Sequence, residues 1–211
     1  QDVAGEWSGW LQWLQTQREK ANSVHSQSKN GYIDPGTFLK QLSERMEDDA
    51  IYVADVGENQ IWSAKNIRIT NGRFLTTGGM GTMGYALPAA IGAKLAAPEK
   101  QVVTVCGDGS FQMVMMELAT ANQHNVPVKL VIMQNGYLGL VREIQQNQYG
   151  GREMAVSLDG SPDFCKIAQA YGVPCAHIQA MEEIPAAVDA LLKKDESYVL
   201  VCTIDPREGT K

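Results

Sequence analysis

The sequence is poor in cysteine and histidine, and neither residue is arranged as a metal site requires. Its four cysteines form no CxxC pair and its three histidines are scattered, so no zinc site is predicted. A chain of 211 residues needs no disulfide scaffold, and a signal-peptide pattern is lacking. We therefore expect the cysteines to be buried thiols of a protein in the reducing cytoplasm.

An excess of positive charge and long apolar runs are lacking as well. Eighteen Lys and Arg face 24 Asp and Glu, a formal charge of −6, which argues against nucleic acid or an anionic membrane face as the main partner. The longest apolar-leaning stretch, residues 75–92, is rich in glycine and broken by Pro88, whereas a membrane-spanning helix needs about 20 mostly apolar residues. The composition favours one globular domain, with an appended arm.

The arm is the first thirty residues, which carry three of the four tryptophans. Its apolar residues recur at helical spacing: Trp7, Trp10, Leu11, Trp13 and Leu14. Such a stripe must rest on something, and packing on the domain's own body is favoured over contact with a missing neighbour. Because the chain opens at Gln1, we expect part of a longer protein, with residues 1–30 as a linker helix and 31–211 as the main domain.

From residue 31 onward, short apolar runs alternate with helical patterns, which predicts an α/β fold. We expect a doubly wound, mostly parallel six-stranded sheet with helices on both faces. Ligands bind beyond the carboxyl ends of the strands in such sheets. The site should therefore be built from four segments that follow strands: residues 57–60, 78–83, 107–110 and 135–140.

Residues 79–84 match the pattern GxGxxG of dinucleotide-binding folds, but their surroundings do not fit. That fold needs an acidic residue about 20 positions further on, at the end of the next strand. Glu99 has the spacing but precedes the strand, and Asp108 lies within its own glycine turn. A nicotinamide site is therefore disfavoured.

Asp108 and Asn135 give a more specific signal. They lie 27 residues apart, which spans one helix and one strand, so both side chains emerge at the same edge of the sheet. Carboxylate and amide oxygens suit Mg²⁺, which completes its octahedron with phosphate and water oxygens. Gly107 and Gly109 allow close backbone approach, and we expect Ser110 to cap a helix whose N-terminus faces an anion. The pair predicts a magnesium–diphosphate site.

These motifs resemble a known family. GDGSFQM, ELATA and QNGYLGLV, with GGMGTMGYALPAAIGA upstream and PDFCKIAQAYG downstream, resemble the catalytic subunits of acetolactate (acetohydroxyacid) synthases. The likeness runs from about residue 6 to 205 and covers only the last third of such an enzyme. It implies the C-terminal thiamine-diphosphate-binding domain and its fold.

The resemblance implies a role for each matching residue. Asp108, Asn135 and the Tyr137 carbonyl would hold Mg²⁺. The Gly81 carbonyl and Met83 would hold the cofactor bent, which favours the tautomer that deprotonates the thiazolium carbon. Backbone N–H groups would surround the diphosphate, and the further cofactor-binding positions are Glu58, Asn59, Gly107, Gly109, Ser110, Leu138, Gly139 and Leu140.

The implied reaction is decarboxylation of pyruvate and carboligation to a second 2-keto acid, a transferase step in branched-chain amino acid biosynthesis. A glutamate on the pyrimidine-binding domain of a partner subunit completes such sites. The resemblance therefore implies a homodimer or tetramer, and it predicts that this chain alone binds weakly and shows no turnover. Many relatives also bind FAD in a middle domain, so FAD is possible in the longer enzyme.

Four positions depart from the family pattern. Gln134 stands where the first of two asparagines is usual, and Glu58 and Asn59 replace the Gln and His of DVGQHQ. A carboxylate aimed at a diphosphate repels it, so we expect Glu58 to turn away or to be bridged by a cation or water. Ile144 replaces a Trp that shapes the second-substrate pocket. This leaves open a related lyase or transferase acting on oxalyl-CoA, glyoxylate or sulfoacetaldehyde, or a non-catalytic nucleotide- or phosphate-binding module.

Overall fold

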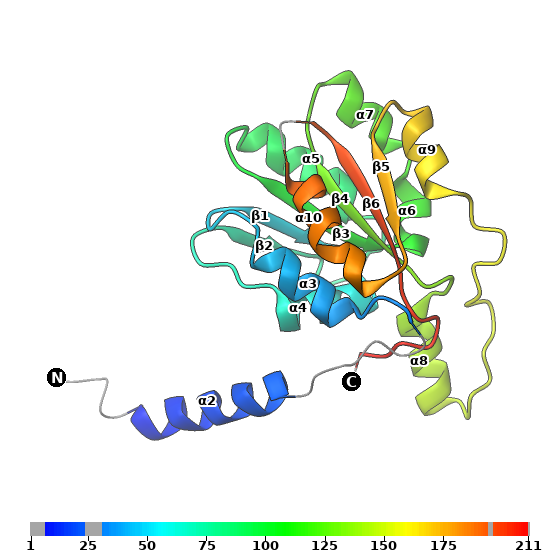
Figure 1. Cartoon of the computed structure of the whole chain (residues 1–211). Coiled ribbons are helices and arrows are strands. Elements are labelled where there is room, and N and C mark those ends of the chain that lie inside the picture. The colour runs from blue at the N-terminus through cyan, green and yellow to red at the C-terminus, as the bar shows by residue number, and fades with distance from the viewer. Residues whose placement is uncertain (1–6, 24–30, 194–195, 211) are drawn as a thin grey trace.

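A six-stranded parallel sheet forms the centre of the computed structural model, which describes residues 7–23, 31–193 and 196–210 (Figure 1). Its order is β2-β1-β3-β4-β6-β5, and every neighbouring pair is parallel. The strands are β1 (Ile51–Ala54), β2 (Arg73–Leu75), β3 (Val102–Gly107), β4 (Lys129–Gln134), β5 (Cys175–Ile178) and β6 (Tyr198–Thr203). The predicted fold class and strand number are confirmed.

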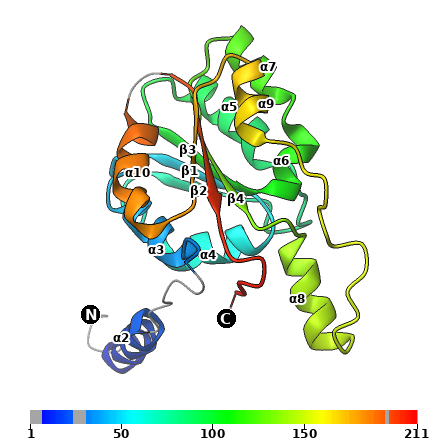
Figure 2. The ribbon, with the colours of Figure 1, turned by 45° about the vertical axis from the view of Figure 1, so that its right-hand side comes forward.

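Helices cover both faces of the sheet, and each face has its own apolar core. On one face lie α3 (Pro35–Ser43), α4 (Glu58–Asn66), α10 (Ile184–Leu192) and the short 3₁₀ turn Met181–Glu183. On the other lie α5 (Ala86–Ala96), α6 (Asp108–Val114), α7 (Glu117–Gln123) and α9 (Phe164–Ala170) (Figures 1 and 2). Buried on both sides, the central strands read as continuous apolar runs, which is why the sequence pattern identified them.

The strand order reverses between β1 and β3. From β1 the chain moves outward to β2, then returns past β1 to β3 and continues in the opposite direction. Such a switch point opens a crevice between the carboxyl ends of the two strands, where ligands bind in open α/β sheets. Helix α8 (Gly139–Gln148) and the C-terminal segment lie at this same edge (Figure 2).

The helix that follows β3 begins earlier than the sequence predicts. Ser110 was expected to be its cap, but α6 begins at Asp108 with Gly107 as the N-cap residue. The chain after β3 then forms two helices, because it breaks into α6 and α7 around Met115 and Met116. The break has no glycine or proline, so the sequence pattern carried no signal for it.

The expectation that all cysteines are free thiols is wrong for two of them. Cys106 and Cys202 are free and buried in the strands. Cys165 on α9 and Cys175 on β5 form a disulfide, with their Cα atoms 5.2 Å apart. They are ten residues apart in the chain, a spacing that matches no disulfide motif, and the turn between α9 and β5 brings them together.

Replacing Cys165 with serine should lower the free energy of unfolding by about 3 kcal/mol, because a crosslink closing a loop of this size restricts the unfolded chain by that amount. Urea unfolding with and without dithiothreitol measures it, and the reductant should bring the wild type to the level of the variant. Thiol titration of the denatured, unreduced chain should find two thiols rather than four. A reductant-insensitive wild type would contradict the prediction.

The arm helix α2 (Ser8–Ser23) forms as predicted, but its apolar stripe does not pack on the body of the domain. Trp7, Trp10, Leu11 and Trp13 are each more than half exposed, and α2 lies apart from the sheet in both views (Figures 1 and 2). The prediction that the stripe packs on the body of the domain is therefore wrong.

None of the helices that the structure describes has the length and apolar character needed to cross a membrane.

Candidate functional site

A cavity of about 200 Å³ opens at the switch point, between the carboxyl ends of β1, β3 and β4. All thirteen site residues singled out in the sequence line it. They are Glu58, Asn59, Gly81, Met83, Gly107, Asp108, Gly109, Ser110, Asn135, Tyr137, Leu138, Gly139 and Leu140. Segments distant in the sequence thus meet at one cavity, as the strand-end argument predicts.

Asp108 joins the ends of β3 and β4. Its Oδ2 accepts a hydrogen bond from the N–H of Gly136 at 2.7 Å, and its Oδ1 accepts one from the N–H of Gly109 at 3.0 Å. The side chain is almost completely buried, and this burial raises its pKa to about 6 against the opposing effect of the two hydrogen bonds. A buried carboxylate of this kind favours a cation that neutralises it.

Asn135 presents its amide beside this carboxylate. Its Oδ1 accepts a hydrogen bond from the N–H of Tyr137 at 3.0 Å, and its Nδ2 donates to Glu58 Oε2 at 3.0 Å. Within the described residues no group of three or more His, Cys, Asp or Glu side chains could hold a metal ion. A cation here would therefore depend on mixed carboxylate, amide and carbonyl oxygens, the donor set that Mg²⁺ accepts.

Two of the backbone N–H groups at the predicted cofactor-binding positions already have acceptors. The N–H of Gly109 donates to Asp108 Oδ1, and the N–H of Leu138 donates to the Val156 carbonyl at 2.8 Å. Their role at a diphosphate stays a prediction, and each would have to give up its present acceptor to take it. Ser110, Gly139 and Leu140 lie in the first turns of α6 and α8, where N–H groups lack partners within their own helix.

The loop carrying Gly81 and Met83 is held against the cavity by Asp55. This fully buried residue, directly after β1, accepts hydrogen bonds through Oδ1 from the N–H of Gly84 at 3.0 Å and through Oδ2 from the N–H of Ala86 at 2.8 Å. The loop turns at Gly81 and Gly84, both with positive φ. No role was predicted for Asp55 from the sequence, and this contact was missed.

Met83 lines the cavity close to Gly109. A Cβ atom added to Gly109 would lie 2.7 Å from Leu138 Cδ2 and 3.5 Å from Met83 Cε. A side chain at position 109 would therefore force Leu138 to shift, whereas its contact with Met83 would be an ordinary one. Met83 and Leu138 thus add apolar side chains to a cavity lining that also contains the polar Asp108 and Asn135.

Glu58 is buried in the first turn of α4 and points away from solvent toward α8. Its Oε1 lies 3.7 Å from Nη2 of Arg142, and both side chains are only 3% exposed. Burial raises the pKa of Glu58 to about 7, although the Arg142 guanidinium opposes the rise. The cation that was expected beside the Glu58 carboxylate is thus the guanidinium of Arg142.

Lowering the pH from 8 to 5 should stabilise the metal-free chain through Glu58. Its pKa is about 7 in the folded chain against 4.5 ordinarily, so the folded state binds more protons between these values. Stability therefore rises as the pH falls through 7 and levels off below 4.5, a contribution of about 3 kcal/mol. Asp108 acts in the same direction, so the measurement is the difference in urea unfolding between wild type and Glu58→Gln in EDTA. Equal pH dependence in both would contradict the prediction.

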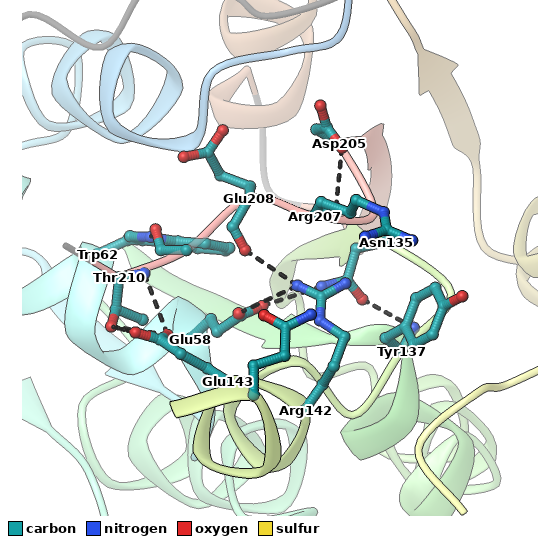
Figure 3. A network of polar contacts seen from close by, with 12 residues as sticks. Glu58, Trp62, Asn135, Tyr137, Arg142, Glu143, Asp205, Arg207, Glu208 and Thr210 are labelled. Carbon is teal, nitrogen blue, oxygen red and sulfur yellow. Dashed lines mark hydrogen bonds and ion pairs between the residues drawn. The ribbon is translucent and has the colours of Figure 1, made fainter. Parts of the chain in front are cut away.

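The C-terminal segment, residues 204–210, crosses the site between α4 and α8 and was missed in the sequence. Trp62 Nε1 donates to the Gly209 carbonyl at 3.0 Å, and Arg142 Nη2 donates to the Glu208 carbonyl at 3.2 Å. Thr210 donates to Glu143 from its N–H and its hydroxyl (Figure 3). No spacing in the sequence signals these contacts, which join residues 66–147 positions apart.

Ile144, the departure expected to affect the second substrate, lies on α8 outside the cavity lining. Its side chain is 40% exposed, while Leu140 and Val141 of the same helix line the cavity. Ile144 itself is therefore partly exposed and does not contribute to the lining of the cavity in this chain.

Comparison with known proteins agrees with this geometry. The family model "Thiamine pyrophosphate enzyme, C-terminal TPP binding domain" matches residues 55–202. The acetolactate synthase isozyme 2 large subunit of Escherichia coli strain K12 is 42% identical over 82% of this chain and 32% of its own length. The acetolactate synthase large subunit of Lactococcus lactis is 36% identical over 92% of this chain and 36% of its own.

The fold is also found among solved structures. The thiamine diphosphate-dependent 4-hydroxybenzoylformate decarboxylase of Rhodococcus jostii RHA1 superposes with a TM-score of 0.78 at 27% identity, covering 86% of this chain and 34% of that one. The chain therefore spans about a third of the length of the relatives that it matches.

Proposed function

Because the chain belongs to the thiamine pyrophosphate enzymes and carries their C-terminal TPP-binding domain, we propose that it forms the magnesium- and diphosphate-binding half of an acetolactate-synthase-like active site. The observation that carries the proposal is the convergence of Asp108 and Asn135 on one cavity at the switch point. The identity with acetolactate synthase large subunits over more than four fifths of the chain supports this particular branch of the family.

The lining of the cavity fits a thiamine diphosphate with its Mg²⁺. Asp108 and Asn135 offer oxygen ligands, and Asn59 Oδ1 and Glu58 Oε1 are buried without a hydrogen-bond partner within the described residues. Met83 and Leu138 add apolar side chains to the same lining, as the rings of the cofactor require. A lining with both polar and apolar groups matches a molecule with both characters.

In this proposal the protein binds and orients, and the cofactor supplies the chemistry. Asp108, Asn135 and the Tyr137 carbonyl would hold Mg²⁺, and the first turns of α6 and α8 would face the diphosphate. Met83 would contact the rings, and the Gly81 carbonyl would accept a hydrogen bond from the exocyclic amine. Bound thiamine diphosphate supplies a nucleophilic carbon for decarboxylating a 2-keto acid such as pyruvate and joining the fragment to a second one.

The longer enzyme would act as a homodimer or tetramer in the cytoplasm, with residues 1–30 as a linker from a preceding domain. A glutamate from the pyrimidine-binding domain of a partner subunit would complete each site. The exposed aromatic stripe of α2 supports contact with such a neighbour. FAD in a middle domain remains a prediction for the longer enzyme.

Titration calorimetry on the 211-residue chain tests this proposal. Thiamine diphosphate should bind weakly and only with Mg²⁺, whereas NAD and ATP should not bind. Pyruvate should not be consumed, because the activating glutamate is not among these residues. Binding of NAD or ATP in preference to thiamine diphosphate would instead support a nucleotide-binding module, and turnover by this chain would refute the division of the site between domains.

A related lyase or transferase is the second candidate, because Ile144 stands where acetolactate synthases carry a Trp. The alternatives are enzymes acting on oxalyl-CoA, glyoxylate or sulfoacetaldehyde. Release of CO₂ by the longer enzyme across a panel of 2-keto acids separates them from acetolactate formation. Pyruvate as the preferred donor, with acetolactate as product, is the result that our proposal expects.

A further inference from the structure

The side-chain amide of Asn135 is held in one orientation by two partners of different kinds. The backbone N–H of Tyr137 can only donate, so it requires the amide oxygen, and it lies 3.0 Å from Oδ1. The carboxyl oxygen Oε2 of Glu58 accepts from Nδ2 at 3.0 Å. Turning the amide over would set two donors against each other at Tyr137 and two oxygens against each other at Glu58.

Glu58 is in turn held by its surroundings. Arg142 lies 3.7 Å from its other oxygen, and the guanidinium is itself fixed by the Glu208 carbonyl and by the Tyr137 ring, whose centroid is 4.9 Å away (Figure 3). A Cβ atom at Gly139 would lie 1.8 Å from Glu58 Oε2, so the backbone of α8 closes the remaining side. The carboxyl group is therefore held between Asn135, Arg142 and the backbone of α8.

We propose that Glu58 and Arg142 are a positioning pair that presents the oxygen of Asn135, rather than its nitrogen, to a divalent cation in the cavity. The inference rests on the proposed function, because it assumes that Asn135 binds the cation. An amide oxygen retains a second lone pair after accepting from Tyr137, whereas an amide nitrogen is no ligand for Mg²⁺ or Mn²⁺. Arg142 acts through Glu58 and touches neither the cation nor the cofactor.

The pair also accounts for the departure at position 58. Acetolactate synthases resemble this chain in the segment DVGENQ but carry Gln where Glu58 stands. A Gln side chain can offer the same acceptor oxygen without a charge and needs no guanidinium beside it. In this chain the carboxyl group of Glu58, with Arg142 beside it, accepts the hydrogen bond from Asn135 that a neutral amide could also accept. Oε2 can accept it in either protonation state of Glu58.

The test measures Mn²⁺ affinity of the 211-residue chain in the presence of thiamine diphosphate, from the electron paramagnetic resonance signal of free Mn²⁺. Glu58→Met, which has no acceptor, should weaken Mn²⁺ binding about tenfold, the usual effect of losing a group that orients a metal ligand. Glu58→Gln keeps an acceptor and should stay within about threefold of wild type. Circular dichroism and thermal unfolding establish that each variant is folded.

A second variant keeps the test decisive if Glu58→Met does not fold. Arg142→Met should weaken Mn²⁺ binding about threefold to fivefold, and Glu58→Gln in the same chain should restore it, because a neutral acceptor needs no counter-charge. Equal affinity of Glu58→Met and wild type, or of Arg142→Met with and without Glu58→Gln, would overturn the positioning role. A wild type that binds neither Mn²⁺ nor thiamine diphosphate would overturn the proposed function instead.

Discussion

Asp108→Asn should reduce Mg²⁺-dependent binding of thiamine diphosphate at least about 100-fold, which equals about 2.7 kcal/mol. The substitution keeps the size of the side chain and an acceptor for the N–H of Gly109 or Gly136, but it removes the charge. A divalent cation held by few protein ligands depends strongly on a carboxylate among them. The loss should therefore appear in the affinity, with the fold retained.

Calorimetry with thiamine diphosphate at fixed Mg²⁺ measures the loss for Asp108→Asn. Asp159→Asn is the matched control, because Asp159 lies exposed in the loop before α9 and carries the same change of charge. Its affinity should equal that of the wild type. Binding by Asp108→Asn within threefold of wild type would show that the cation is held elsewhere, and the assignment of the site would fail.

Asp55→Ala should lower the free energy of unfolding by about 4 kcal/mol, the largest stability effect that we expect. The buried carboxylate of Asp55 accepts from the N–H groups of Val56, Gly84 and Ala86. Each buried donor left without an acceptor costs about 1–3 kcal/mol, and part of that cost is recovered when the loop moves and water enters. The variant should also lose cofactor affinity, because the loop carrying Gly81 and Met83 is released.

Urea unfolding of Asp55→Ala and Asp55→Asn separates the contributions. The amide keeps one acceptor oxygen, so Asp55→Asn should cost about half as much as Asp55→Ala. Asp159→Ala on the exposed loop should change stability by less than about 0.5 kcal/mol. An Asp55→Ala chain as stable as the control would mean that the loop is held by other contacts.

The sheet and its cavity could be predicted from the sequence because both follow from local patterns. Buried parallel strands read as apolar runs, and polar or glycine-rich residues directly after them lie at one edge whatever the order of the strands. That reasoning identified the segments that carry Asp108, Asn135 and the other predicted site residues without knowing which strands are neighbours, but it did not reach Trp62 or Val141, which also line the cavity. The break between α6 and α7 left no such pattern.

Contacts between groups that lie far apart in the sequence could not be predicted. Asp55 acts on N–H groups 29 and 31 residues further along the chain, and nothing in the letters DVG indicates which amides it meets. The sequence showed that Glu58 needed a compensating charge. Arg142 could be identified as its source only from the fold, which brings α8 beside α4. The disulfide likewise depends on how α9 turns into β5.

The contact between Trp62 and the Gly209 carbonyl turns one aromatic side chain into an optical reporter. Trp62 is 5% exposed and the only tryptophan outside the first thirty residues, while the described tryptophans of α2 already lie in water. If the C-terminal segment detaches from α4 and α8, the indole becomes exposed to water and its fluorescence emission shifts to longer wavelength. The signal from α2 stays constant, so a difference spectrum would follow the release of this segment in real time, without any added dye.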